Sequence, residues 1–575
     1  MRGMPKVRHR RPYRQRAAVV AAAAALLAPA GDAGSIRFRD AAAAWGIDFR
    51  HHHGGTGQLY MIETMGSGVV VFDYDGDGDR DVFFVDSGAL PGYRGETPRS
   101  RLFRNDGGRF ADVTAASGIA VATYGMGATA GDADGDGDLD LYVTGFGPNQ
   151  LLLNDGDGSF TDVTATAGTG DPLWSASAAF ADADGDGDLD LYVTNYVDFS
   201  FDNNPICGNQ ERGARSYCHP EVYNPLPDRF YLNRGPGADG IVRFDDATRA
   251  AGFGDARGNG LGVAWSDFDG DGRQDLYVAN DKTANFLFLN RGTGDDGMPR
   301  FEEVALVSGA ALSDAGQEEA GMGIAVGDAT GDGRPDLVVT HLDLETNAFY
   351  VNQGGLFLDR RFPSQIGPAS HLMVGFGTAF ADLDQDGDLD LVIANGHIIH
   401  NVELFANGST YKQPNQALEN LGGGRFRLLP EAGLEAVRSS RGLAVGDLDG
   451  DGDLDLAINN SNDLCEVYEN VTAASGAWLQ LDLADRHTAN RFGIGARLEL
   501  IAGGRRQVGE VRTASSYLSQ NDLTYHAGIG DAAAAELRLR WPDGRRQTLR
   551  RLPAGHRLRL IAPPLNSGSA PRSGR

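Results

Sequence analysis

The sequence predicts an all-β protein in which a seven-bladed β-propeller precedes a small C-terminal β domain. Two repeated features lead to this prediction. A nine-residue aspartate-rich loop occurs seven times, with an asparagine after each copy and a Phe-x-acid element before it, which is weaker in the seventh copy as Phe426-Arg427-Leu428. The resulting unit of roughly 50 to 60 residues repeats over 35–475. Each unit has room for four short strands, and closing the units into a ring would cover their apolar faces and open edges.

The repeated loop has the spacing of a calcium site. Every copy has aspartate at positions 1, 5 and 9 and glycine at position 6, and all but one have aspartate at position 3. A hard cation such as Ca²⁺ binds six or more oxygens at about 2.4 Å. Carboxylates from positions 1, 3, 5 and 9 and the backbone carbonyl of position 7 would supply them, and glycine at position 6 permits the sharp turn. We therefore predict up to seven calcium ions.

The predicted ligand positions of the seven loops, named loop one to loop seven in chain order, are as follows, with position 7 acting through its backbone carbonyl. They are Asp73, Asp75, Asp77, Asp79 and Asp81; Asp132, Asp134, Asp136, Asp138 and Asp140; Asp182, Asp184, Asp186, Asp188 and Asp190; Asp267, Asp269, Asp271, Arg273 and Asp275; Asp328, Thr330, Asp332, Arg334 and Asp336; Asp382, Asp384, Asp386, Asp388 and Asp390; and Asp447, Asp449, Asp451, Asp453 and Asp455.

These loops differ from EF-hands, which place a glutamate at position 12. Position 12 is Phe84 in loop one and Val143 in loop two, and a strand-like run of β-branched and aromatic residues follows. The loop is therefore expected to be a turn between two strands, with position 9 as a direct ligand. A solvated Asp/Gly-rich turn would explain one such copy but not seven in register. Loop five has Thr330 at position 3 and is expected to bind its ion most weakly.

The order of the repeat landmarks favours a closed ring. The first Phe-x-acid element, at Phe38, has no closing asparagine before it, and the last closing asparagine has no such element after it. We therefore expect the two ends of the repeat region to share one blade. An open solenoid is the alternative, and the absence of a polar capping repeat argues against it. The closing asparagines are Asn105, Asn154, Asn233, Asn290, Asn352, Asn420 and Asn470.

Charge and the N-terminal segment limit the function classes. The formal net charge is -28, and the loops supply most of the acidic excess. Such a surface argues against nucleic-acid binding, which needs a basic footprint. Residues 1–30 combine a basic start with a small-apolar run and a small-x-small cleavage site, which is typical of an export signal. No later segment is apolar enough for a transmembrane span, so we expect a secreted, periplasmic or cell-surface protein.

Three repeats, units one, three and six, carry long inserts after the strand that follows the loop. Loops held on a rigid scaffold often carry recognition, although plain lengthening of surface loops is equally open. The unit-three insert contains Cys207 and Cys218, for which an exported location favours a disulfide; two reduced thiols are the alternative. The unit-six insert contains Glu403 and the histidines His397 and His400, which lack a clear third ligand for a transition metal.

Residues 476–562 form the predicted C-terminal β domain. Strand-like runs alternate with turns there, and residues 476–575 contain sixteen arginines against eight acidic residues. This basic balance suggests that the domain docks on the acidic repeat region. The Pro/Ser/Gly-rich residues 563–575 are expected to be disordered.

A Gly-x-Gly strand, such as the one at Gly321 and Gly323, leads into the aspartate loop, and this combination resembles the FG-GAP/VCBS repeats that also form integrin α-subunit propellers. Residues 175–180 of the third copy depart from it, which makes the packing of that blade less certain. The C-terminal domain looks like the ASPIC/UnbV domain of the cartilage acidic protein family. These resemblances imply a calcium-loaded extracellular propeller used for adhesion or binding, and they supply no catalytic residue. The C-terminal resemblance rests on Asn490–Ala496, Ser516–Gln520, His526–Gly530 and Trp541–Gly544.

Together these features predict a secreted, calcium-dependent module that binds or adheres to an extracellular protein or glycan. An exported polysaccharide-active enzyme on a propeller scaffold is the alternative, with Glu403 near His400 as the best acid outside the loops. The chain contains no GxSxG, HExxH or P-loop motif, and its loop carboxylates are committed to metal. A purely structural spacer is a third interpretation.

Overall fold

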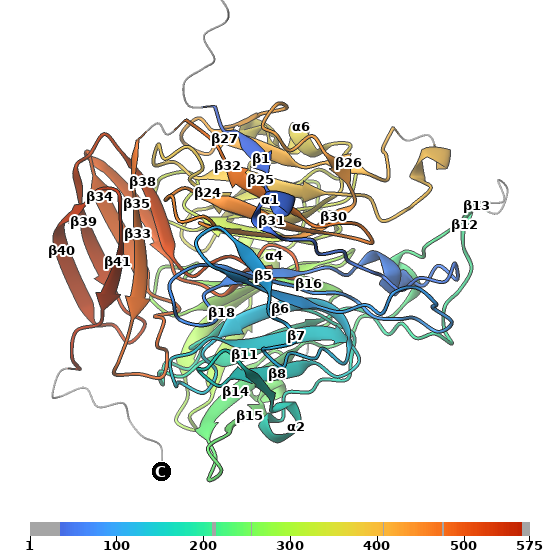
Figure 1. The fold of residues 1–575 in the computed structure, drawn as a ribbon, viewed down its shortest axis with the longest axis horizontal. Coiled ribbons are helices and arrows are strands. Elements are labelled where there is room, and N and C mark those ends of the chain that lie inside the picture. Colours follow the sequence, from blue (N-terminus) through green and yellow to red (C-terminus); the bar gives the residue numbers. More distant parts are fainter. Residues whose placement is uncertain (1–34, 210–213, 255, 406–407, 474–475, 566–575) are drawn as a thin grey trace, which may run out of the picture. The chain divides into compact units, whose positions relative to one another are not determined.

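The computed structural model describes residues 35–209, 214–254, 256–405, 408–473 and 476–565. The predicted export signal, residues 1–30, lies outside this part, as do residues 566–575 of the predicted disordered tail. Within the described residues the fold is all-β, with many small sheets and with helices of about one turn. Figure 1 shows the sheets of the repeat region side by side, with the C-terminal strands gathered along one side of them.

In the described part of the chain the repeats form seven four-stranded antiparallel sheets. In each sheet the strand before the aspartate loop comes first, and the following strands lie side by side in the order of the repeat. In sequence order their strands are β2 (Val69–Phe72), β3 (Asp81–Phe84), β4 (Arg101–Asn105) and β5 (Phe110–Asp112); β6 (Tyr124–Gly131), β7 (Asp140–Phe146), β8 (Gln150–Asn154) and β9 (Phe160–Asp162); β10 (Ser175–Ala181), β11 (Asp190–Asn195), β14 (Arg229–Pro236) and β15 (Val242–Asp246); β16 (Gly260–Ser266), β17 (Asp275–Asn280), β18 (Phe286–Thr293) and β19 (Pro299–Glu303); β20 (Ile324–Gly327), β21 (Asp336–Val339), β22 (Ala348–Asn352) and β23 (Phe357–Asp359); β24 (Gly375–Ala381), β25 (Asp390–Asn395), β27 (Gln416–Asn420) and β28 (Phe426–Leu428); and β30 (Ser440–Gly446), β31 (Asp455–Asn460), β32 (Glu466–Asn470) and β1 (Phe38–Asp40).

Sheet seven combines the two ends of the repeat region. Its outermost strand, β1, comes from the start of the described chain and pairs antiparallel with β32, so that Phe38 lies opposite Asn470. The sequence analysis predicted this shared sheet from the two unpaired landmarks, and the prediction is confirmed.

Neighbouring sheets contact one another through their first strands, which we call the inner strands. β2 contacts β6, and contacts continue through β10, β16, β20, β24 and β30, which contacts β2 again. Apolar side chains fill the spaces between successive sheets. Between sheets one and two they include Phe72 and Leu141, and between sheets seven and one they include Val71, Phe84 and Val467. The series of sheet-to-sheet contacts therefore returns to its start.

The Phe-x-acid elements form the outermost strands, where each residue has a separate role. Phe110 is buried, while Asp112 Oδ1 accepts hydrogen bonds from the backbone N–H (3.0 Å) and the hydroxyl (2.6 Å) of Thr114. The acid therefore fixes the turn that leaves the sheet, as expected of an aspartate that binds the backbone two residues on. The helices of the described residues are short: α1 (Ala42–Trp45), α2 (Thr164–Ala167), α3 (Thr248–Ala251), α4 (Ala305–Ser308), α5 (Arg361–Ser364) and α6 (Ile366–Ser370).

The C-terminal domain consists of two further sheets packed on each other. Their strands alternate leucines inward and polar residues outward, and the leucines and Trp541 form a shared core. One sheet has the order β38 (Tyr525–Gly530), β33 (Ala477–Ala484), β41 (His556–Ile561), and the other has the order β35 (Arg505–Glu510), β34 (Arg497–Ala502), β39 (Ala534–Arg540), β40 (Arg546–Pro553).

Residues 510–523, which we call the central segment, leave this domain and lie against the repeat sheets. The segment contains β36 (Ala514–Ser515) and β37 (Ser519–Gln520), which extend sheet one. The segment accepts a hydrogen bond from the first strand of every repeat sheet. In chain order these bonds are Val69 N to Ser519 Oγ (3.1 Å), Ala130 N to Gln520 Oε1 (2.8 Å), Phe180 N to Thr513 Oγ1 (3.0 Å), Ser266 Oγ to Glu510 Oε2 (2.5 Å), Ile324 N to Ser516 O (2.9 Å), Thr378 N to Ser516 Oγ (3.0 Å) and Val445 N to Asn521 Oδ1 (2.9 Å).

Glycines near the inner strands make room for the central segment. A Cβ atom on Gly68 would lie 2.0 Å from the Leu518 carbonyl oxygen, and one on Gly127 would lie 2.7 Å from the same atom. The third repeat has Ser177 instead, and its hydroxyl accepts a hydrogen bond from Leu518 N at 3.2 Å. The glycine-free β10 is nevertheless buried along its whole length.

Candidate metal centre

Each aspartate loop connects the inner strand of a sheet to its second strand, as the repeat pattern predicted. The structure brings three carboxylates of a loop together so that one oxygen of each lies within 4.8 Å of the others. Five such groups each contain positions 1 and 3. The third carboxylate comes from position 5 in three of these groups and from position 9 in the other two. The groups are Asp73, Asp75 and Asp81; Asp132, Asp134 and Asp136; Asp182, Asp184 and Asp186; Asp267, Asp269 and Asp271; and Asp382, Asp384 and Asp390.

The position 9 aspartates are fixed by two backbone N–H groups. Asp140 is fully buried, with Oδ2 accepting from Ala133 N (2.8 Å) and Oδ1 from Asn154 N (2.8 Å). The same two bonds, one from inside the loop and one from the closing asparagine, recur in all seven loops. A carboxylate has about four lone-pair sites, so these bonds orient position 9 and leave it free to ligate an ion.

Each loop also holds one carboxylate oxygen that is buried without a hydrogen-bond partner in the described structure. Leaving such an acceptor unpaired costs about 1–3 kcal/mol, so each of these oxygens requires a partner. An oxygen that faces other carboxylate oxygens in a closed loop suits a hard cation, and the residues of all seven loops therefore fit a calcium ion. The atom is Oδ1 of position 1 in Asp73, Asp132, Asp267, Asp328 and Asp382, and Oδ1 of position 7 in Asp188 and Asp453.

The raised pKa values of the loop aspartates also favour a bound cation. Burial, reinforced by the neighbouring aspartates, raises the pKa of Asp132 to about 8 and the pKa of Asp134 to about 6. The same causes raise the pKa of Asp382 to about 8 and the pKa of Asp453 to about 9. A divalent cation would favour the ionised carboxylates and remove this penalty.

The backbone turn needs left-handed residues at two positions of the loop. Gly76 at position 4 has φ 71° and Gly78 at position 6 has φ 102°, a region that costs a residue with a Cβ atom. The sequence analysis used only position 6. Position 4 is also glycine in six loops, and in loop six Gln385 adopts φ 63° there.

The closing asparagines have a role that spacing did not reveal. The Asn154 side chain donates a hydrogen bond from Nδ2 to the backbone carbonyl of Tyr74 at 2.7 Å. Tyr74 is position 2 of the preceding loop. The bond from a closing asparagine to position 2 of the preceding loop recurs in the other six sheets. Each asparagine is thus bonded both to its own loop, through the position 9 aspartate, and to the loop of the neighbouring sheet.

The C-terminal domain contacts every aspartate loop, as the charge split between the two halves suggested. Arginines and neutral donors both take part. In chain order of the loops the contacts are Arg557 to Gly78 O, Arg491 Nε to Gly135 O (2.9 Å), Asn490 N to Gly187 O (2.7 Å), Arg540 Nη2 to Asp267 Oδ2 (2.9 Å), Arg497 Nη2 to Gly333 O (2.5 Å), Gly528 N to Asp382 Oδ2 (2.7 Å) and Gln480 Nε2 to Asp447 Oδ2 (2.8 Å).

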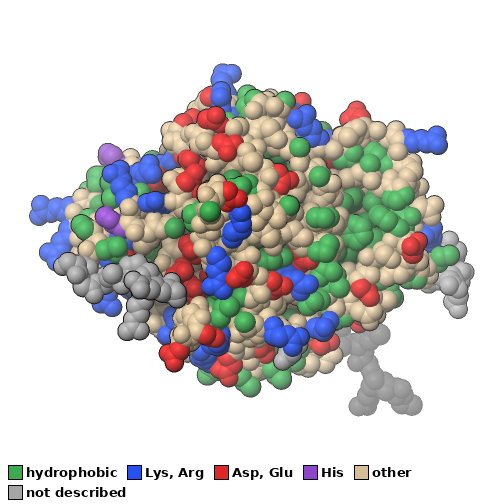
Figure 2. All heavy atoms as spheres, turned by 90° about the horizontal axis from the view of Figure 1, so that it is seen from below, with side chains coloured by type: hydrophobic (Ala, Val, Ile, Leu, Met, Phe, Trp, Pro, Cys, Tyr) green, Lys and Arg blue, Asp and Glu red, His purple; other side chains and the backbone are tan. Residues whose placement is uncertain are grey.

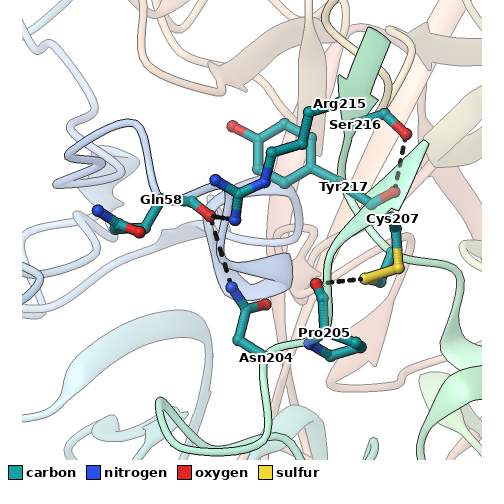
Figure 3. Close-up of a disulfide and its surroundings, with 8 residues drawn as sticks. Gln58, Asn204, Pro205, Cys207, Arg215, Ser216 and Tyr217 are labelled. Carbon is teal, nitrogen blue, oxygen red and sulfur yellow. Dashed lines mark hydrogen bonds between the residues drawn. A yellow bond between two sulfur atoms is a disulfide. The ribbon is translucent and has the colours of Figure 1, made fainter. Parts of the chain in front are cut away.

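The three inserts emerge at the opposite end of the sheets from the loops. They connect second to third strands, and successive connections of an antiparallel sheet alternate between its two ends. In the unit-three insert Cys207 and Cys218 form a disulfide that joins β12 (Cys207–Asn209) to the segment after β13 (Ala214–Ser216). Beside it the carbonyl of Gln58 accepts bonds from Arg215 (2.5 Å) and Asn204 (3.5 Å), which tie the insert to the first repeat (Figure 3).

The candidate residues of the unit-six insert each make separate contacts. His397 Nδ1 accepts a bond from Ile399 N (2.9 Å) and its Nε2 lies 3.3 Å from Asp343, whereas the His400 ring packs edge-on against Tyr217. Glu403 accepts a bond from Tyr411 N at 2.9 Å, which lowers its pKa. A glutamate with a lowered pKa is a poor general acid.

Comparisons with known proteins agree with the repeat pattern. The family model described as FG-GAP-like repeat matches several overlapping stretches that together cover more than half of the chain. A second model, FG-GAP repeat, matches 441–476, and the model ASPIC and UnbV matches 486–566. The stretches of the first model are 73–143, 133–193, 267–339, 328–393 and 401–458.

Among curated proteins the chain is similar to cartilage acidic protein 1. It is 26% identical to the Xenopus tropicalis protein over 327 residues, 53% of this chain and 45% of that protein. It is also 26% identical to the human protein over 335 residues, 53% of this chain and 44% of that protein. The match therefore spans less than half of the length of these relatives.

Among solved structures, an Agrocybe aegerita lectin that recognises non-reducing terminal N-acetylglucosamine aligns with 72% of this chain and 91% of its own. The sequence identity is 17% and the TM-score 0.37. In the described residues no helix has the length and apolar character of a membrane span.

Proposed function

The chain belongs to the FG-GAP-like repeat family and ends in an ASPIC and UnbV domain, and from this premise we propose that it is a secreted, calcium-binding β-propeller that binds an extracellular protein or glycan. We assign the propeller to 35–475 and the C-terminal domain to 476–562. The proposed compartment is secreted, periplasmic or cell-surface. The disulfide supports it, since such bonds persist in oxidising compartments.

The seven sheets are proposed to be the blades of one closed ring. The shared sheet of β1 and β32, the inner-strand contacts that return from β30 to β2, and the chain of asparagine bonds support closure. Closure would leave no exposed inner edge for aggregation.

The observation that carries the metal assignment is the buried, unpartnered carboxylate oxygen in each of the seven loops. Positions 1, 3, 5 and 9 would hold the ion with the backbone carbonyl of position 7. In five loops the unpartnered oxygen belongs to position 1 of this set, and in loops three and seven it belongs to the position 7 side chain. Bound calcium would neutralise the loop carboxylates. The closing asparagine then joins neighbouring sheets, because it donates hydrogen bonds to the position 9 aspartate of its own loop and to the loop of the preceding sheet.

We propose that ligand binds at the end of the sheets that carries the inserts. The loop end is covered by the C-terminal domain, and the central segment lies among the inner strands. On the insert of unit three Phe201, Ile206 and Val222 expose 37%, 72% and 51% of their surface. Figure 2 shows hydrophobic side chains gathered toward the end away from the C-terminal strands.

Binding of the purified full chain to an array of extracellular glycans and surface proteins, with calcium and after its removal, tests this function. The proposal expects a ligand that is bound only with calcium and is lost when Phe201 and Ile206 are changed to serine. The Leu306→Ser variant, which alters an exposed apolar residue of α4 (69% exposed), is the matched control. Calcium-dependent folding without any ligand would instead support a structural spacer.

A further inference from the structure

Position 7 divides the seven loops into two kinds. Five loops have an aspartate there, and loops four and five have Arg273 and Arg334. The sequence analysis assigned position 7 a role only through its backbone carbonyl. The side chains nevertheless differ by two units of charge at the rim of each proposed ion site, so their placement matters for affinity. The five aspartates are Asp79, Asp138, Asp188, Asp388 and Asp453.

Both arginines fold back onto their own loop in the same way. The Arg273 guanidinium pairs with the Asp271 carboxylate, and its Nε donates to the Asn290 carbonyl at 2.8 Å. In loop five Arg334 likewise pairs with Asp332, and its Nε donates to the carbonyl of the closing asparagine at 2.8 Å. In both loops the arginine therefore pairs with the position 5 carboxylate, which is a proposed metal ligand, and its hydrogen bond to the closing asparagine fixes it there.

The C-terminal domain brings arginines to loops one, two, four, five and six. At loops one, two, five and six these arginines donate to backbone carbonyls, whereas at loop four Arg540 pairs with a carboxylate of the loop. Arg540 Nη2 lies 2.9 Å from Asp267 Oδ2, which is position 1 of loop four. The glycines at position 6 are tightly covered: a Cβ on Gly272 would lie 2.4 Å from Arg540, and one on Gly333 would lie 2.2 Å from Arg506. By contrast, the domain donates to the position 1 carboxylates of loops six and seven with neutral groups, Gly528 N and Gln480 Nε2.

Loop one also has an arginine nearby, but it is already neutralised. Arg80 lies 3.6 Å from Asp73 and binds two further carboxylates, Asp482 at 3.0 Å and Asp522 at 2.5 Å. Loops four and five differ because, in the described residues, Arg273 and Arg334 pair only with a carboxylate of their own loop. Loop five also has Thr330 in place of the position 3 carboxylate.

We propose that the loops form two classes of calcium site: loops one, two, three, six and seven bind tightly, and loops four and five bind weakly because arginines hold their carboxylates. This inference rests on the proposed calcium function. Both weak loops keep a buried, unpartnered oxygen, on Asp267 and Asp328, so they remain sites. Calcium affinity in such loops follows the charge of the ligand set. The two arginine-held loops are thus the part of the ring that responds to changes in calcium concentration.

Calcium titration of the full chain by calorimetry, after treatment with a chelating resin, tests the proposal. We expect five sites and a separate class of two sites at least about tenfold weaker. Arg273→Asp and Arg334→Asp introduce the residue that the other five loops have, and each is expected to move one site from the weak to the tight class. The reverse change, Asp388→Arg in loop six, is the matched control and is expected to move one site to the weak class.

The outcomes separate the inference from the function on which it rests. Seven equivalent sites, or arginine variants that leave the five-to-two division unchanged, would overturn the two-class proposal while keeping the calcium function. Absence of any calcium binding would overturn the calcium function itself. Circular dichroism of each variant in calcium confirms that a changed count does not reflect unfolding.

Discussion

The Asn105 side chain donates a hydrogen bond from Nδ2 to the Leu448 carbonyl at 2.8 Å, joining the first repeat to loop seven across 343 residues of sequence. Asn105 is almost fully buried; the same Nδ2 also donates to Arg80 O (3.0 Å), and its Oδ1 accepts from Gly108 N (2.8 Å). The other six closing asparagines make the equivalent bond to the loop before them. Asn105 is therefore the residue through which this series of bonds joins the two ends of the repeat region.

Replacing Asn105 by alanine removes these bonds and leaves buried carbonyls without a donor. We expect the free energy of unfolding to fall by about 2 kcal/mol. The Asn352→Ala variant breaks the equivalent junction with loop four and is expected to lose a similar amount. The exposed Gln317→Ala control should stay within about 0.5 kcal/mol. Denaturant unfolding measures all three. If Asn105→Ala unfolds with the free energy of the unaltered protein while Asn352→Ala is destabilised, then Asn105 does not join sheets seven and one.

The Gly68→Ala variant tests whether the central segment lies among the inner strands. A Cβ there would lie 2.0 Å from the Leu518 carbonyl, so the backbone of sheet one or of the segment must move. We expect a loss of about 3 kcal/mol or more, in the range of severe overpacking. The control is Gly237→Ala, whose Cβ would have side-chain atoms of Asp239 and Arg243 as its nearest neighbours, at 3.1 Å and beyond. Equal melting temperatures for the two variants would show that the segment is not seated there.

Arg80 tests the docking of the C-terminal domain. It is 4% exposed and binds Asp482 and Asp522 of that domain. Arg80→Met leaves the partly buried Asp522 carboxylate without its cation and leaves Asp482 with Arg557 alone, at 2.8 Å, so we expect a loss of about 2–3 kcal/mol. The surface pair of Arg39 and Glu469 is the matched contrast, and Arg39→Met should leave the melting temperature almost unchanged, because exposed ion pairs contribute little to stability. If thermal unfolding ranks the two variants equally, the contact between the C-terminal domain and the repeat sheets is absent.

The stabilisation by calcium should increase with pH. Burial and neighbouring carboxylates raise the pKa of Asp73 to about 6 and the pKa of Asp382 to about 8 in the folded, ion-free protein. Between about pH 4 and pH 8 the folded state then binds more protons than the unfolded chain, so ion-free stability falls as pH rises. Calcium favours the ionised carboxylates and offsets this loss.

The difference in melting temperature between calcium-loaded and resin-treated protein, measured from about pH 5 to about pH 8, checks this expectation. We expect the difference to widen with pH, mainly because the resin-treated protein becomes less stable. A difference that is constant or narrows would mean that the loop carboxylates are not the groups that calcium stabilises.

Local pattern was enough to predict the loops, the strands around them and the shared sheet of Phe38 and Asn470, because each depends on short spacing or on the order of landmarks. The bond of each closing asparagine to the preceding loop was not predictable, since it joins residues far apart in the chain. The same holds for the central segment: the Gly-x-Gly strands belonged to the repeat pattern, but Leu518, which lies against Gly68, belongs to the C-terminal domain. The charge split indicated that the two halves would dock, yet only the structure shows which loop each donor reaches.

The central claim is that the aspartate loops hold calcium and thereby stabilise the ring. Elemental analysis of the dialysed full chain, combined with its melting temperature before and after chelation, tests it most directly. We expect about five calcium ions per chain to survive dialysis, one for each loop with aspartate at position 7, and a clear fall in melting temperature when they are removed. Less than one calcium per chain, with a melting temperature that chelation leaves unchanged, would contradict the account.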